Sequence, residues 1–263
     1  MIVHATAIGP SAVSVDTRHQ NYNMKIRTSV TLLLLVGSFC FASVSAAGQT
    51  RSIMARADVY AAALRSLRTA RSKPTIESVI RKGRAVSEKL DELESLSDAQ
   101  FALLQTKMKG FEVNRKEVVF IEPNAKYFAG LAKQYGTKTD AAFFALMMEV
   151  KPHNLWYAYY EQQTDVTGCT RYGSGLITKL YGKAVQFKSL HPRSYVTDVN
   201  RITKEIMAEF LDNTCACRGK ETVRKEFQLF IATYPKDKNT PAIKRRLAML
   251  RTGGDFKFNC KSG

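Results

Sequence analysis

Histidine is scarce in this chain: its 263 residues include four, and only His153 and His191 lie beyond residue 47. Neither stands at ligand spacing to a cysteine, so we expect no metal site and no cofactor. The chain also lacks Gly-x-Ser-x-Gly, His-Glu-x-x-His and a phosphate-binding loop. These absences argue against the familiar hydrolase chemistries. A serine or cysteine triad would have to use His153, and the sequence places no nucleophile beside it.

Long apolar runs are also missing. The apolar stretch at residues 28–41 is shorter than the roughly 20 residues that a membrane-spanning helix needs. It follows the basic residues of 24–27 and precedes the small residues of 43–47. A basic start, a short apolar centre and a small-residue end are typical of a secretory signal peptide, so residues 24–47 are predicted to be one.

Cleavage is expected near Ala46 or Ala47, which would make the product periplasmic or secreted. Residues 1–23 lack the arginine-rich amphipathic pattern of an organellar transit peptide. We interpret them as a non-native upstream extension, with a cytoplasmic tail on an uncleaved anchor as the alternative. The remainder, 48–263, is long enough for a single helical domain, with a possible subdivision near 110–123.

Acidic residues are under-represented, since 40 Lys and Arg stand against 23 Asp and Glu, for a net charge of +17. Residues 51–90 carry ten Lys and Arg against three acids, 215–263 carry twelve against four, and 91–214 carry fifteen of each. Outside the inner membrane such an excess points to an envelope polyanion or an acidic protein as partner, with peripheral membrane contact as an option. We expect no nucleic-acid partner.

Two basic clusters illustrate this choice. Arg65, Arg68 and Arg71 follow one another at helical spacing, and Lys244, Arg245 and Arg246 form a second group. The plain interpretation of both is a solvated helix face. The sharper alternative is contact with an anionic surface.

Cysteine is limited to five residues, and the predicted cleavage removes Cys40. The four that remain, Cys169, Cys215, Cys217 and Cys260, predict two disulfides in an exported protein. A bridge from Cys215 to Cys217 would close a very tight ring. We therefore expect these two to reach Cys169 and Cys260, one each, in an order that stays open. A Cys-x-Cys redox pair is the alternative.

Apolar residues recur mostly at three- and four-residue steps, which predicts an all-α fold. The expected architecture is an irregular, orthogonal multi-helix bundle stapled by two disulfides. Its helices are 52–71, 76–93, one from Ser97 to Gly110, one to Gly136, one closed at Pro152, 176–188, 194–213 and two after residue 220. At most a minor β element is expected, near 117–121, and residues 162–175 are expected to be loop.

The last two predicted helices form a hairpin from Phe227 to Leu250 around Tyr234-Pro235. This hairpin is similar to one helical pair of a tetratricopeptide-like repeat in bacterial envelope proteins. It lacks the usual glycine of that motif, and no second copy follows at a fixed period. We therefore treat it as one αα-hairpin.

The central segment, residues 156–173, differs from its surroundings because it combines the only tryptophan with four tyrosines, amides and carboxylates. Aromatic faces beside amides and carboxylates suit sugars or peptides. The plain interpretation is a core helix whose rings pack inward. The candidate ligand-binding residues are Trp156, Tyr159, Tyr160, Gln162, Gln163, Asp165, Arg171 and Tyr172.

Three functions follow from these patterns. The first is an exported helical binding protein of the bacterial envelope, with a basic surface and an aromatic-polar groove. The second is an envelope hydrolase that acts on wall glycan or peptide through Glu161 and Asp165, which would share a face on a helix. The third is an inhibitor or immunity-type partner of a secreted toxin.

Overall fold

The computed structural model describes residues 52–69, 74–116, 118–153, 155–164, 167–212 and 214–252. All of them belong to one compact unit, Gln49–Gly263. The predicted upstream extension and signal peptide lie outside the described residues.

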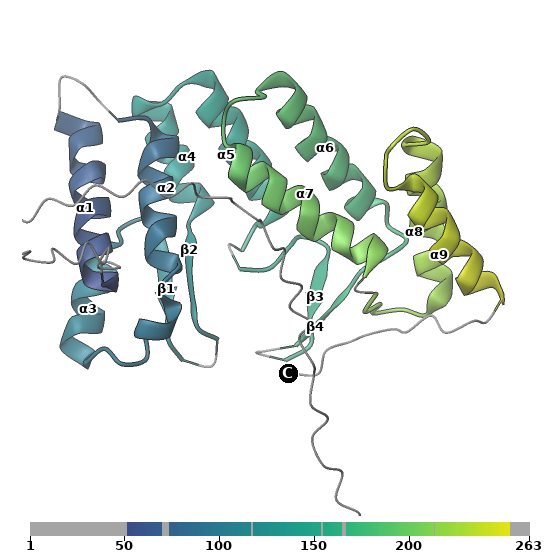
Figure 1. The fold of residues 1–263 in the computed structure, drawn as a ribbon, viewed down its shortest axis with the longest axis horizontal. Helices are drawn as coiled ribbons and strands as arrows, with labels where there is room; N and C mark the ends of the chain where they lie inside the picture. Colours follow the sequence, from purple (N-terminus) through teal and green to yellow (C-terminus); the bar gives the residue numbers. More distant parts are fainter. Residues whose placement is uncertain are drawn as a thin grey trace, which may run out of the picture. The chain divides into compact units, whose positions relative to one another are not determined.

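The described part of the chain is mostly helical, which confirms the predicted class (Figure 1). Its α-helices are α1 (Ile53–Thr69), α2 (Ile76–Ser87), α3 (Asp98–Lys107), α4 (Ala125–Tyr135), α5 (Lys138–Val150), α6 (Leu176–Leu190), α7 (Val196–Leu211), α8 (Lys220–Thr233) and α9 (Thr240–Thr252). A short 3₁₀ turn, Leu90–Glu92, follows α2. None of the described helices is both long and apolar enough to cross a bilayer.

Two antiparallel strand pairs replace the single β element that was expected. β1 (Phe111–Asn114) pairs with β2 (Phe120–Pro123) in a register that sets Asn114 opposite Phe120. β3 (Tyr160–Gln162) pairs with β4 (Gly168–Thr170). The β element predicted near 117–121 overlaps β2 at Phe120 and Ile121, and of these two side chains that of Ile121 reaches the core. The predicted loop at 162–175 is wrong for the residues of β4.

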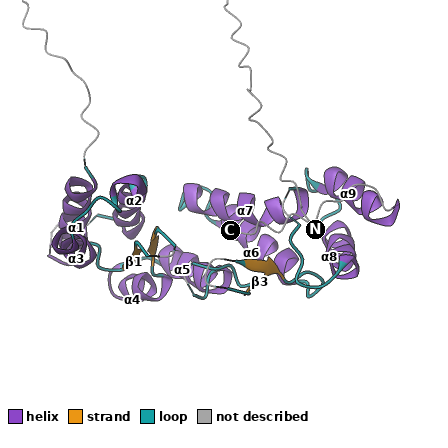
Figure 2. Ribbon diagram, turned by 90° about the horizontal axis from the view of Figure 1, so that it is seen from below, coloured by secondary structure: helices purple, strands orange, loops and turns teal. Residues whose placement is uncertain are grey.

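Neighbouring elements pack mainly against elements close in sequence (Figures 1 and 2). Helix α2 contacts α1, α4 and β2, and α3 contacts α1 and β1. Further along the chain, α5 contacts α4 and α6, and α7 contacts α6 and α9. Helices α8 and α9 pack together as the predicted hairpin, and α8 also contacts α6. The C-terminal part of α7 and the middle of α8 contact the central segment through Glu209 and Glu226.

Four of the described α-helices, namely α2, α3, α4 and α5, begin at a side-chain cap from a residue next to the helix. Ser97 and Gln100 form a capping box at the start of α3, and Thr137 and Asp140 form another at α5. Such caps satisfy amide groups that have no partner within the helix. Helices α6, α7 and α8 have no side-chain cap at their own N-termini, and α6 follows Gly175.

Aromatic side chains contact one another in both halves of the core. In the first half, Tyr60, Phe111, Phe128 and Phe144 meet in succession, with ring centroids 5.2–5.8 Å apart. In the second half, Phe210 contacts both Phe227 and Phe230, which lie on α8. Aromatic pairs at these distances add about 0.5–1.5 kcal/mol each beyond the burial of their surfaces.

Candidate functional site

The central segment forms a hairpin that packs its rings inward. Tyr157, Tyr159 and Tyr172 are buried, so the interpretation of inward-facing aromatic residues is correct, although the backbone is a strand pair and not a helix. Tyr157 stacks on Tyr159 with their ring centroids 5.0 Å apart. Trp156 and Tyr160 remain half-buried and meet edge to face at 6.0 Å.

The carboxylate of Glu209, on α7, joins three hydroxyl groups of this hairpin. It accepts hydrogen bonds from Tyr160 at 2.6 Å, Thr170 at 2.8 Å and Tyr172 at 3.2 Å. The Tyr172 hydroxyl also lies 2.8 Å from the backbone carbonyl of Glu209. Burial raises the pKa of Glu209, even though the three hydroxyl donors oppose the shift. Two of the predicted ligand residues, Tyr160 and Tyr172, therefore direct their hydroxyls into the protein.

A second acidic residue on α7 has a similar role. The Tyr157 hydroxyl donates to Glu205, and the ammonium of Lys151 lies 4.7 Å from the centre of the Tyr157 ring. Lys151 is buried, which lowers its pKa, while the nearby carboxylates of Glu122 and Glu205 act in the opposite direction. Lys151 directly follows α5, and no sequence pattern predicted its role.

A third carboxylate, Glu226 on α8, holds the turn that follows the hairpin. It accepts the backbone N–H groups of Gly173 at 2.9 Å, Gly175 at 2.8 Å and Thr178 at 3.0 Å. The Thr178 hydroxyl donates to the same carboxylate at 2.8 Å. Glu226 thus provides, from a distant helix, the cap that α6 lacks locally.

One disulfide is present among the described residues, between Cys169 on β4 and Cys217 after α7. The pairing agrees with the expectation that Cys217 reaches one of the two distant cysteines. Cys260 lies outside the described residues, so the second predicted bridge stays a prediction. Of the two predicted disulfides, the described part of the chain therefore contains one.

The outer residues of the segment are distributed over the exposed edge of the hairpin. Glu161 and Gln162 lie on β3 and are exposed. The Gln163 amide contacts the Cys169 sulfur at 3.2 Å, and Arg171 donates to the carbonyl of Ala158. Asp165 lies outside the described residues. Because Glu161 is on a strand, the helical spacing that would pair it with Asp165 does not apply.

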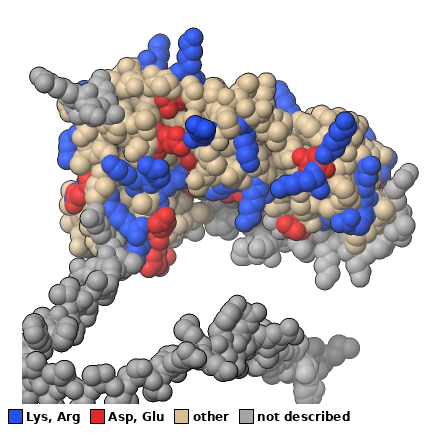
Figure 3. All heavy atoms as spheres, turned by 45° about the horizontal axis from the view of Figure 1, so that its top comes forward, with Lys and Arg blue, Asp and Glu red and all other residues tan. Residues whose placement is uncertain are grey.

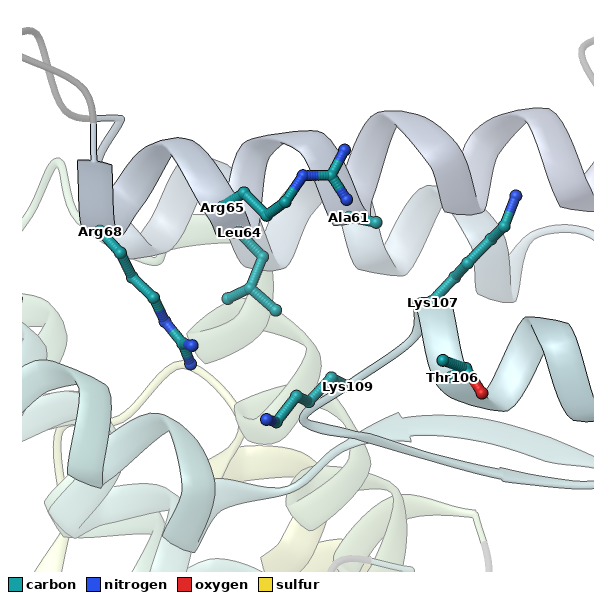
Figure 4. A pocket seen from close by; sticks show the side chains of 7 residues that line it. All are labelled: Ala61, Leu64, Arg65, Arg68, Thr106, Lys107 and Lys109. Atoms are coloured by element: carbon teal, nitrogen blue, oxygen red, sulfur yellow. The ribbon is translucent and has the colours of Figure 1, made fainter.

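A basic pocket of about 230 Å³ lies at α1 and the end of α3 (Figure 4). We call it the α1–α3 pocket. Its cations are Arg65 and Arg68 from α1, Lys107 from the last residue of α3, and Lys109 from the turn before β1. Leu64 adds an apolar wall, and Figure 4 shows Leu64 and Arg68 extending from α1 toward the space that Lys109 approaches from the opposite side.

Buried contacts beneath this pocket fix its shape. The hydroxyl of Tyr60 donates to the carbonyl of Lys109 at 2.6 Å. Gly110 follows with a φ of +94°, and a Cβ there would lie 2.3 Å from the ring of Tyr127. The Tyr127 hydroxyl in turn lies 3.1 Å from the guanidinium of Arg68. The turn that presents Lys109 therefore requires glycine, for both its conformation and its space.

The pairing of the four cations decides the character of the pocket. Lys107 forms an ion pair with Asp58. Arg65 and Lys109 are exposed and make no ion pair within the described part of the chain. Figure 3 shows Lys and Arg side chains spread over the face in view, with Asp and Glu gathered in fewer places. The sequence pointed to Arg65, Arg68 and Arg71, of which Arg71 lies outside the described residues. Lys109 joins the other two only through the fold.

The second basic group on α9 is only partly solvated. Lys244 and Arg245 are exposed. Arg246 instead donates to the carbonyl of Phe210 at 2.7 Å and to the hydroxyl of Thr214 at 2.9 Å. The expectation of a fully solvated face is therefore wrong for Arg246, which ties α9 to the end of α7.

In the described ranges, no three His, Cys, Asp or Glu side chains converge where a metal ion could bind. Comparisons with protein-family models, with curated proteins and with solved structures find no significant match to this chain.

Proposed function

We propose that this protein is an exported binding protein of the bacterial cell envelope that holds an anionic partner in the α1–α3 pocket. The observation that carries the proposal is the excess of unpaired cations there. Arg65 and Lys109 have no acidic partner among the described residues, and Asp58 neutralises only Lys107. Exposed cations of this kind attract phosphate and carboxylate groups.

The charge of the whole chain supports the same partner class. Residues 51–90, which include α1 and α2, carry ten Lys and Arg against three acids. The predicted signal peptide would bring this surface to lipid headgroups, lipopolysaccharide and wall polymers. Phosphate-bearing headgroups are the chemistry we choose for the test, because each cation near an anionic membrane surface contributes about 1 kcal/mol.

The aromatic-polar groove remains a secondary proposal, since its outward residues are limited to the exposed edge of the hairpin and half-buried Trp156. The hydrolase alternative through Glu161 and Asp165 also remains a prediction, and no contact of the described residues favours it. For the second staple we propose a bridge from Cys215 to Cys260, because Cys217 already pairs with Cys169.

Vesicle binding tests the main proposal. Residues 48–263, which contain the compact unit, are sedimented with phosphatidylglycerol vesicles and with phosphatidylcholine vesicles at low and high salt. We expect binding to the anionic vesicles only, and its loss at high salt, because salt screens exposed charges over about 10 Å.

A pair of matched double variants locates the site. Arg65→Gln with Lys109→Gln should weaken binding by about 30-fold, from two charges at about 1 kcal/mol each. Lys244→Gln with Arg245→Gln removes the same charge from exposed positions on α9 and should have a much smaller effect. An equal loss in both variants would show that net charge alone binds the vesicles, and the pocket would be rejected.

A further inference from the structure

A second cavity, of about 530 Å³, lies where α2, β2 and the start of α7 meet. We call it the α2–α7 cleft. Its volume falls within the range of about 300–1,000 Å³ that is usual for small-molecule sites. It shares no lining residue with the α1–α3 pocket.

The inner wall of the cleft is a closed network of two arginines and two acids. Arg84 lies 2.5 Å from Asp198 and 3.5 Å from Glu122. Arg201 lies 3.3 Å from Glu122 and 3.7 Å from Asp198. The four side chains come from α2, β2 and α7, so the network joins the three elements and neutralises itself.

The rim of the cleft is different, because its cations are free. Arg81 on α2 and Arg193 before α7 are both exposed, and neither makes an ion pair among the described residues. A guanidinium offers paired N–H donors that match the two oxygens of a carboxylate. Val196, with 38% of its surface exposed, adds an apolar contact between these charges and the wall.

The backbone beside Val196 is held in a strained form. Tyr195 has a φ of +53°, the only positive value of a residue other than glycine in the described ranges. Glu77 lines the cleft, and its carboxylate accepts a hydrogen bond from the backbone N–H of Tyr195 at 2.8 Å. The buried Tyr195 ring stacks on Phe143 at 3.7 Å. Strain of this kind persists only where surrounding contacts enforce it, and it is concentrated at ligand sites.

The balance of charge selects the class of ligand. The cleft is lined by four arginines and by four acids, which are Glu77, Glu88, Glu122 and Asp198. A polyanion would meet as much repulsion as attraction there. A molecule with one carboxylate at one end and N–H donors along its length would satisfy the free guanidiniums and the acidic oxygens together.

We propose that the α2–α7 cleft binds the free carboxyl end of a short peptide. Arg81 and Arg193 hold the terminal carboxylate, Val196 contacts a side chain, and Glu77 accepts an N–H group of the peptide. This site is independent of the α1–α3 pocket and does not rest on the proposed envelope function.

The test titrates trialanine and its C-terminal amide into the purified full chain and follows binding by calorimetry. We expect trialanine to bind at least tenfold more tightly than the amide, since only the free acid offers a carboxylate. Equal affinity for the two peptides, or no binding of trialanine up to roughly 10 mM, would overturn the proposal. So would displacement by inorganic phosphate at the same concentration as trialanine, because that would indicate a simple anion site.

Matched variants complete the test. Arg81→Gln with Arg193→Gln should weaken trialanine binding at least tenfold, and both positions are exposed and unpaired, so folding should be preserved. Arg65→Gln with Lys109→Gln, in the other pocket, should leave it unchanged. If the Arg65→Gln and Lys109→Gln variant lost trialanine binding and the Arg81→Gln and Arg193→Gln variant kept it, the peptide would bind in the α1–α3 pocket. That result would overturn the inference, whatever the result of the vesicle experiment.

Discussion

Glu226 accepts both the backbone N–H and the hydroxyl of Thr178, at 3.0 Å and 2.8 Å, although the two residues are 48 positions apart. The same carboxylate accepts two more N–H groups, from Gly173 and Gly175. A buried carboxylate on α8 thereby fixes the start of α6 and the turn before it.

The variant Glu226→Gln should lower the free energy of unfolding by about 2–4 kcal/mol. A glutamine has one acceptor oxygen, so at least one buried N–H donor would face its amide nitrogen. Urea denaturation measures the change. Glu221→Gln is the control, because Glu221 lies on the same helix, is exposed and pairs only with nearby Arg224. A loss no larger than that of the control would contradict the structural role of Glu226.

The contribution of Glu209 to the free energy of unfolding should decrease as pH rises. Burial raises its folded pKa, so the native state binds the proton more tightly than the unfolded chain does. The stabilisation is complete below the unfolded pKa of about 4.3 and is lost as pH rises through the higher folded value. Urea unfolding across this range should show the free energy of unfolding of the wild type falling, relative to that of Glu209→Gln, as pH rises. A difference that stays flat or grows with pH would refute the assignment.

Two helical glycines should respond to alanine in opposite directions. A Cβ at Gly83, on α2, would lie 2.3 Å from the buried ring of Phe111, whereas one at Gly130, on α4, would meet nothing within 4 Å. Gly83→Ala should therefore cost about 1–3 kcal/mol through overpacking. Gly130→Ala should gain about 0.5–1 kcal/mol from helix propensity. Thermal unfolding of the two variants tests the packing of α2 on β1, and a gain at both positions would contradict it.

The bridge between Cys169 and Cys217 should appear in non-reducing peptide mapping of the purified protein. Replacing both residues with serine should lower the free energy of unfolding by about 2–4 kcal/mol, the usual loss for a native disulfide. Peptides that link Cys169 to Cys260 instead would show that the pairing is wrong. The same map would test the proposed bridge between Cys215 and Cys260.

The helices were predictable because their signals are local. The caps at Ser97 and Thr137 lie within three residues of the groups they bind. Of the strands, only β2 overlaps a predicted element, the one near 117–121, since each strand has only three or four residues and alternation over so short a run is weak evidence. The core helix expected for the aromatic part of residues 156–173 was wrong for this reason, although three of its tyrosine rings do pack inward.

The two buried carboxylates do have a signal in the sequence. Ile206 precedes Glu209-Phe210 by three residues on α7, and Val223 precedes Glu226-Phe227 in the same way on α8. In both helices an acid occupies the apolar stripe itself, where a solvated residue is not expected. Its partners could not be named, because they lie 37–53 residues away in the chain.

The candidate sites were harder still to predict. Arg65 and Arg68 share a helix face, but Lys109 reaches their pocket only because Tyr60 and Gly110 shape the turn that carries it. The α2–α7 cleft combines Arg81 with Arg193, which are more than 100 positions apart. Helical spacing reports one face of one element, and it contains no information on which faces meet.

Glu209 and Glu226 are synthesised later than the residues that donate hydrogen bonds to them. A chain that grows from its N-terminus completes the central hairpin before the carboxylates that receive its hydroxyl and amide groups have been made. Helices α1 to α5 contact mainly their neighbours in sequence and can assemble early, as short-range contacts generally do. A product that stopped before α8 would leave Gly173, Gly175 and Thr178 without their acceptor, so we expect prematurely terminated chains to be cleaved first in the turn before α6.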